Sequence, residues 1–125
     1  MMTQSSLESA FAQAWRVFAP DAPSPVSEYR FDSIRRFRLD YAWPEQRVGV
    51  ELQGGTYTQG RHTRGAGYDA DCVKANLLAS HGWAVYRVTA SMLRDPEAVV
   101  AMVREALTNS QTIIHSDDYR RATTR

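Results

Sequence analysis

Residues 35–53 read RRFRLDYAWPEQRVGVELQ, and two runs of alternating side chains flank the segment Pro44–Arg47. The alternation predicts two antiparallel β-strands joined by a hairpin centred between Glu45 and Gln46. In this register one face collects the apolar side chains, which are Leu39, Tyr41, Trp43, Val48, Val50 and Leu52. The opposite face carries the polar side chains, which are Arg36, Arg38, Asp40, Glu51 and Gln53.

This register brings two carboxylates together. Asp40 is directly opposite Glu51, and the Cβ atoms of such a pair lie ~4.5–5.5 Å apart. Two bare negative charges at this spacing repel, so a positive group is expected between them. Neighbouring arginines are one candidate, and a divalent cation such as Mg²⁺, which typically uses one or two carboxylates, is the other.

The composition indicates one compact globular domain, since the 125 residues are 43% hydrophobic and include three tryptophans. The single cysteine, Cys72, cannot form an internal disulfide, and the sequence has no apolar run long enough to span a membrane. We therefore expect a cytoplasmic protein without a membrane partner. The formal net charge of +1 excludes coating of nucleic acid through overall charge.

Basic residues nevertheless cluster around the hairpin and in the segment that follows it. They predict a rim that contacts phosphates or, in the simpler interpretation, a solvated sheet face with salt bridges. Lys74 is the only lysine among fifteen basic residues, and an ammonium group adjusts its pKa more readily than a guanidinium group, so Lys74 is a candidate for chemistry. The clustered residues are Arg30, Arg35, Arg36, Arg38, Arg47, Arg61, His62 and Arg64.

The rest of the sequence predicts a scaffold of helices and strands around the hairpin. Apolar periodicity predicts helices over 4–18 and 68–81 and a third that opens at Asp95. Further strands are expected over 28–31 and 83–88, and residues 54–67 are expected to form a long loop that closes over a substrate. The fold class is α/β, in one domain over residues 1–108. Residues 109–125 lose periodicity and are expected to form a flexible tail.

Five motifs within this scaffold point to one family. They are RFRLDYAWP (36–44), VELQGG (50–55), GRHTR (60–64), DCVKAN (71–76) and GWAVYR (82–87). Over residues 4–108 the chain resembles small members of the PD-(D/E)XK nuclease superfamily, near the very-short-patch-repair endonucleases and their phage-borne relatives. The resemblance implies a restriction-endonuclease-like αβββαβα core, with a central mixed sheet flanked by helices.

The resemblance also implies a metal site and a DNA partner. Asp40 and Glu51 would hold Mg²⁺, for which Mn²⁺ would substitute, and Glu8 or Glu28 would add a further carboxylate. Gln53 stands where the family motif has lysine, so Lys74 or His62 would replace that lysine. The clustering of basic residues predicts the DNA-contacting residues Arg35, Arg36, Arg38, Arg61 and Arg64, and Tyr57 in the loop is the aromatic residue expected to meet a base.

The predicted function is a Mg²⁺-dependent DNA endonuclease that acts in DNA repair or recombination. One alternative is a non-catalytic nucleic-acid-binding accessory module that retains the nuclease fold. Another is a structural protein with no affinity for nucleic acid. A branched DNA substrate would require two active sites, for which a homodimer is the expected arrangement.

Overall fold

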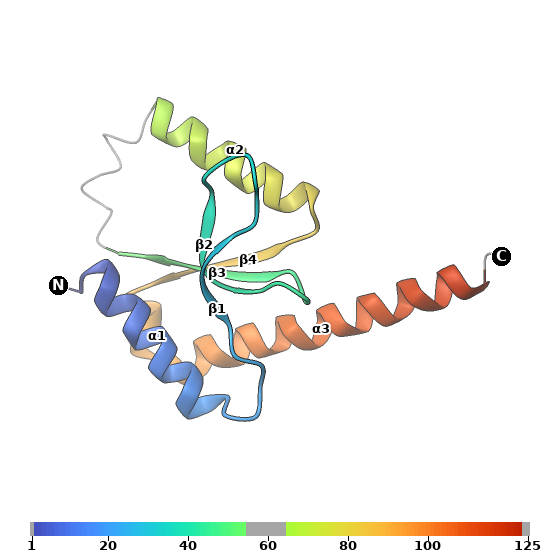
Figure 1. Ribbon diagram of the computed structural model, residues 1–125. Coiled ribbons are helices and arrows are strands. Elements are labelled where there is room, and N and C mark those ends of the chain that lie inside the picture. Colours follow the sequence, from blue (N-terminus) through green and yellow to red (C-terminus); the bar gives the residue numbers. More distant parts are fainter. Residues whose placement is uncertain (1, 55–64, 124–125) are drawn as a thin grey trace.

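The computed structural model describes residues 2–54 and 65–123, with residues 111–123 as helical backbone only. Its elements follow the predicted order of helix, three strands, helix, strand and helix, with one short 3₁₀ helix added (Figure 1). They are α1 (Gln4–Phe18), β1 (Val26–Arg30), β2 (Arg38–Trp43), β3 (Val48–Gln53), α2 (Ala66–Ser80), β4 (Ala84–Thr89), the 3₁₀ helix η2 (Met92–Arg94) and α3 (Pro96–Thr123).

The strands form one mixed sheet in the order β1-β2-β3-β4. β2 is antiparallel to both β1 and β3, whereas β3 and β4 are parallel and are connected through α2. α1 and α3 lie on one side of this sheet, which we call the α1 face, and α2 lies on the other, the α2 face (Figure 1). The predicted α/β class with a mixed sheet flanked by helices is confirmed.

The central hairpin has the predicted register. Tyr41 pairs with Val50 and Trp43 with Val48, and the amide of Gln46 closes the turn on the carbonyl of Trp43 at 3.1 Å. The two valines and Trp43 are buried on the α1 face, in the main core between the sheet, α1 and α3. The alternation of apolar residues in this part of the hairpin therefore predicted correctly which side chains are buried.

Leu39 departs from the prediction that it shares a face with Tyr41 and Trp43. It is fully buried in a second cluster on the α2 face, with Ala42 and with Leu78 of α2. Tyr41 stays on the α1 face, where its hydroxyl donates to the Glu8 carbonyl at 2.9 Å. Strict alternation would put residues 39 and 41 on the same face, so it is interrupted between them, as at a β-bulge.

The neighbouring strand is irregular at the equivalent point. Glu28 lies between the pairs Ser27–Tyr41 and Tyr29–Leu39, and its φ of 50° is in the left-handed region that non-glycine residues rarely adopt. Tyr29 packs with the α2-face cluster, as Leu39 does. The alternation of side chains between the two faces of the sheet is thus interrupted in both strands at the same level, at Glu28 in β1 and at Asp40 in β2.

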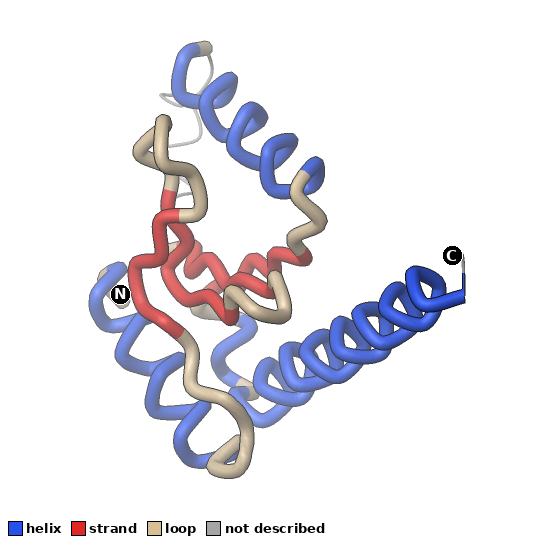
Figure 2. The backbone as a smooth tube through the Cα atoms, turned by 45° about the vertical axis from the view of Figure 1, so that its right-hand side comes forward, coloured by secondary structure: helices blue, strands red, loops and turns tan. Residues whose placement is uncertain are grey.

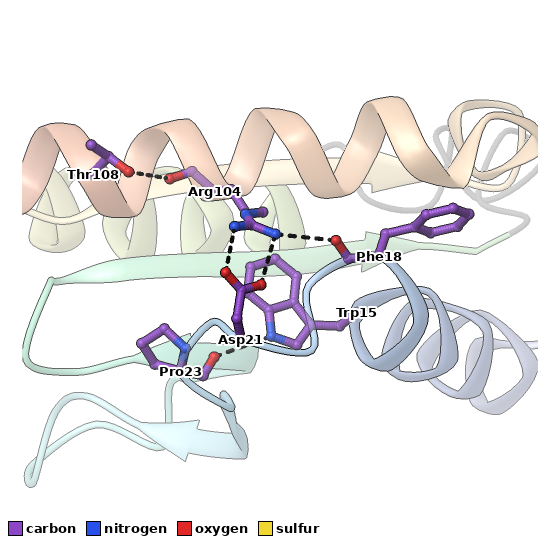
Figure 3. Close-up of polar contacts among 6 residues, drawn as sticks. All are labelled: Trp15, Phe18, Asp21, Pro23, Arg104 and Thr108. Atoms are coloured by element: carbon purple, nitrogen blue, oxygen red, sulfur yellow. Dashed lines mark hydrogen bonds and ion pairs between the residues drawn. The ribbon is translucent and has the colours of Figure 1, made fainter.

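Polar contacts fasten the end of α1 to α3 and to the following segment (Figure 3). Arg104 of α3 donates to both carboxylate oxygens of Asp21 and to the Phe18 carbonyl, each at 3.2 Å. The indole of Trp15 donates to the Pro23 carbonyl at 3.1 Å. These contacts fix the orientation of α1, which supplies one wall of the site described below.

α3 is longer than the apolar periodicity predicted. Its start is as predicted, since Asp95 Oδ1 accepts from the amide of Ala98 at 3.3 Å. The helix then continues to Thr123, where the sequence indicated a tail from residue 109, and its C-terminal part extends away from the sheet (Figure 2). The prediction of a helix over 95–108 depended on apolar periodicity, which is lost after residue 108, so the sequence carried no signal for the rest of the helix. None of the helices described combines the length and apolarity needed to cross a bilayer.

Candidate functional site

Asp40 is held by main-chain and side-chain donors at the point where β2 and β3 stop pairing. Pairing ends at Tyr41 and Val50, although both strands continue. Beyond that point Asp40 Oδ2 accepts from the Leu52 amide at 2.7 Å and from Gln4 Nε2 at 3.3 Å. Because strand amides point along the sheet toward the neighbouring strand, the Asp40 carboxylate occupies the gap between β2 and β3.

Two further carboxylates line the same cavity as Asp40, on the α1 face. The cavity has a volume of about 260 Å³ and brings together Glu8 of α1, Glu28 of β1 and Asp40 of β2. The pKa of Glu8 is raised above its usual value of 4.5, first by burial and then by the negative charges of Asp40 and Glu28. We call this the acidic cavity. Its lining residues are Ser5, Glu8, Ser9, Ser27, Glu28, Asp40 and Tyr41.

Glu51 lies on the α2 face and is paired with the only lysine of the chain. Lys74 Nζ of α2 donates to Glu51 Oε1, and the two side chains are only 20% and 13% exposed, respectively. A pair so shielded from water interacts more strongly than one on an open surface. A second cavity of about 230 Å³ opens beside the pair, and Asp71 and Arg87 also line it. Asp71 and Lys74, three residues apart on α2, thus lie on the same face of that helix.

Asp40 and Glu51 therefore do not face each other as the hairpin register predicted. The register was correct as far as Tyr41 and Val50, but the interruption at Asp40 turns its side chain toward α1, while Glu51 contacts α2. Of the candidate ligands, the structure brings Glu8, Glu28 and Asp40 together and leaves Glu51 on the other side of the gap.

The acidic cavity has the donor chemistry of a magnesium site. Its carboxylates are the hard oxygen ligands that Mg²⁺ prefers, and the negative charges of Asp40 and Glu28 add to the effect of burial in raising the pKa of Glu8. In the part of the chain that the structure describes, however, no three Asp, Glu, His or Cys side chains are arranged to hold an ion. The residues fit such an ion chemically, and side-chain rotation would have to precede its binding.

Of the remaining predicted site residues, Gln53 and three arginines lie in the described part of the chain and four residues lie outside it. Gln53 pairs in register with Thr89 and, two residues after Glu51 on the same strand, shares its face. Arg35, Arg36 and Arg38 are exposed along the loop before β2 and its first residue. The other candidates, Tyr57, Arg61, His62 and Arg64, lie outside the described residues.

Gln4 is a site residue that the sequence analysis missed. Gln4 lies three residues before Leu7 and so continues the buried face of α1 toward Asp40, whereas Ser5 and Ser9 line the acidic cavity from beside that face. The signal for Gln4 was a polar residue in line with the apolar stripe, which the sequence analysis passed over because it began the stripe at Leu7.

Comparison of the chain with protein-family models, with curated proteins and with solved structures gives no match. A functional interpretation therefore depends on the motifs, on the order of elements and on the placement of these side chains.

Proposed function

We propose that the protein is a metal-dependent endodeoxyribonuclease built on a restriction-endonuclease-like core. The observation that carries the proposal is the position of the Asp40 carboxylate, 2.7 Å from the Leu52 amide. Standard bond lengths then put this oxygen within about 5 Å of the Glu51 Cα, because Glu51 and Leu52 share a peptide bond. Rotation of the Glu51 side chain away from Lys74 would bring both carboxylates to one gap in the sheet.

In this proposal Asp40, Glu51 and either Glu8 or Glu28 hold Mg²⁺ or Mn²⁺. When bound, the ion supplies a Lewis acid for a phosphodiester oxygen and lowers the pKa of a coordinated water. Gln53, on the Glu51 face, would orient that water by hydrogen bonding. His62 remains a second candidate for the basic role.

Lys74 has a role in this proposal that follows from its pairing. While it neutralises Glu51, its ammonium group is occupied. If Glu51 were to hold the cation instead, the Lys74 ammonium would be free to stabilise negative charge on a phosphate in the transition state. This arrangement supplies the positive group that Gln53 cannot.

A non-catalytic nucleic-acid-binding module is the second candidate. The ion pair of Glu51 with Lys74 favours it, because a carboxylate already neutralised by lysine needs no metal for stability. The exposed arginines before Asp40 suit either function, since contacts to phosphates position DNA whether or not it is cleaved.

A plasmid-nicking assay with Mg²⁺ and with EDTA tests the proposal. Asp40→Asn and Glu51→Gln remove the charges but keep hydrogen-bonding oxygens, so we expect folded variants with nicking lower by about 100-fold or more. Glu45→Gln, at an exposed glutamate in the hairpin turn, is the matched control and should retain wild-type activity. Salt-sensitive DNA binding without metal-dependent nicking by the wild type would establish the accessory module instead. Absence of DNA binding would leave a structural protein.

A further inference from the structure

Ile34 is the most exposed of the large apolar side chains described, at 90% exposure. It lies in the loop between β1 and β2, which leads directly into Arg38 and Asp40. A single exposed apolar residue is ordinary on a protein surface. The surroundings of Ile34 are unusual, because its loop has specific internal contacts and is flanked by positive charge.

Contacts among its own residues stabilise the conformation of this loop. Asp32 Oδ1 accepts from the amide of Ile34 at 2.9 Å and from that of Arg35 at 3.4 Å. At the base of the loop the rings of Phe31 and Phe37 stack, with centroids 6.3 Å apart and planes 13° from parallel. These contacts present Ile34 on an ordered tip, so binding through it would require little loss of conformational entropy.

Positive charge lies on both sides of this tip. Arg35 and Arg36 follow Ile34 directly, and Arg30 pairs in register with Arg38 across β1 and β2. Like charges directly opposite each other in a sheet are destabilising. Among the described residues, acids contact these arginines at long distances, 3.7 Å from Arg38 to Glu28 and 3.8 Å from Arg35 to Asp32. This arrangement suits a polyanion that passes on both sides of Ile34.

We propose that the β1–β2 loop is a DNA-insertion element, in which Ile34 wedges between base pairs of a duplex from the minor groove. The flanking arginines contact phosphates on either side of the insertion, as in proteins that kink DNA with an apolar wedge. Removing Ile34 from water and holding the backbone in the kink offset the cost of unstacking one base step. The inference extends the proposed function, because it names duplex DNA as the ligand and assigns how the duplex is held near Asp40.

Binding in EDTA to a duplex that contains 2-aminopurine tests this inference without cleavage. Unstacking raises the fluorescence of 2-aminopurine, so we expect a rise on binding of the wild type. Ile34→Ala should abolish the rise and weaken binding about tenfold, as burial of an isoleucine predicts, with an unchanged slope of log affinity against log salt. Arg36→Ala should instead reduce that slope by about one and keep the fluorescence rise. Val73→Ala, at an exposed valine of α2, is the control and should change neither.

Wild-type fluorescence that stays constant on binding, or an Ile34→Ala variant that binds as the wild type does, would overturn the insertion role. Binding confined to single-stranded DNA or RNA would overturn it equally. Because no step requires catalysis, these outcomes are distinct from failure of the nicking assay, which bears on the nuclease proposal alone. Ile34 is almost fully exposed, so thermal unfolding of Ile34→Ala should match that of the wild type.

Discussion

Asp40 replaces a main-chain acceptor in the sheet: its Oδ2 accepts from the Leu52 amide at 2.7 Å, where β2 and β3 no longer pair. Leu52 is only 3% exposed, so loss of this acceptor would leave its amide without a partner. The residue that the proposed function needs for chemistry is therefore also structural.

Asp40→Ala should lower the free energy of unfolding by about 1–3 kcal/mol, the usual cost of an unsatisfied buried donor. Asp40→Asn retains an oxygen acceptor and should cost less than about 1 kcal/mol. Urea unfolding of both variants measures the difference. Equal stability of the two variants would show that the Asp40–Leu52 hydrogen bond contributes little to the free energy of unfolding. Asp40→Asn is the variant used in the nicking assay because it is expected to be the more stable of the two.

Glu8→Gln should stabilise the protein at neutral pH. The folded-state pKa of Glu8 is raised above 4.5 by burial and by Asp40 and Glu28, so its ionisation opposes folding. This penalty is fully present above the folded-state pKa and absent below the unfolded value of 4.5, where Glu8 is protonated in both states. The melting temperature of Glu8→Gln should therefore exceed that of the wild type at pH 7 and converge with it near pH 4. A gain that persists at low pH would assign the effect to something other than this charge.

Variants of the Glu51–Lys74 ion pair distinguish a role in stability from a role in catalysis. Lys74→Met should cost about 1–3 kcal/mol, because it leaves the Glu51 carboxylate shielded and unpaired, and adding Glu51→Gln should recover part of that loss. Lys74→Arg keeps a positive partner and should unfold within about 1 kcal/mol of the wild type. Under the proposed function, Lys74→Arg should still lower nicking about tenfold or more, since a guanidinium does not reproduce the position of the ammonium charge. Full activity of Lys74→Arg would limit Lys74 to a structural role.

The sequence predicted the fold best where alternation or periodicity reported burial. The register of Tyr41 with Val50 and the helix over residues 4–18 are of this kind, because each buries one regular face. It did not predict the reversal at Asp40. Leucine is apolar on either face of a two-sided sheet, so Leu39 matched the alternation without showing which helix it would contact.

The candidate site was predictable in part for the same reason. The chemistry of its residues is local, and Glu8, Glu28 and Asp40 do meet in one cavity. The partners of each carboxylate depend instead on how α1 and α2 pack on opposite faces, which involves residues such as Gln4 and Lys74 that are remote in sequence. The assumed pairing of Asp40 with Glu51 failed because it extended a hairpin register beyond the last paired residues.

Gly49 gives a direct test of the position of Leu39. A Cβ added at Gly49 would lie 2.7 Å from Leu39 Cδ1, and Leu39 is fully buried, so its side chain has little room to move. Gly49→Ala should therefore cost about 1–3 kcal/mol from overpacking, and Leu39→Ala alone about 2–5 kcal/mol from the cavity it leaves. The double variant should be more stable than the sum of these losses predicts, because the new methyl group enters the space that Leu39 vacates. Additive losses in urea unfolding would contradict contact between the two residues, and with it the change of face at Asp40.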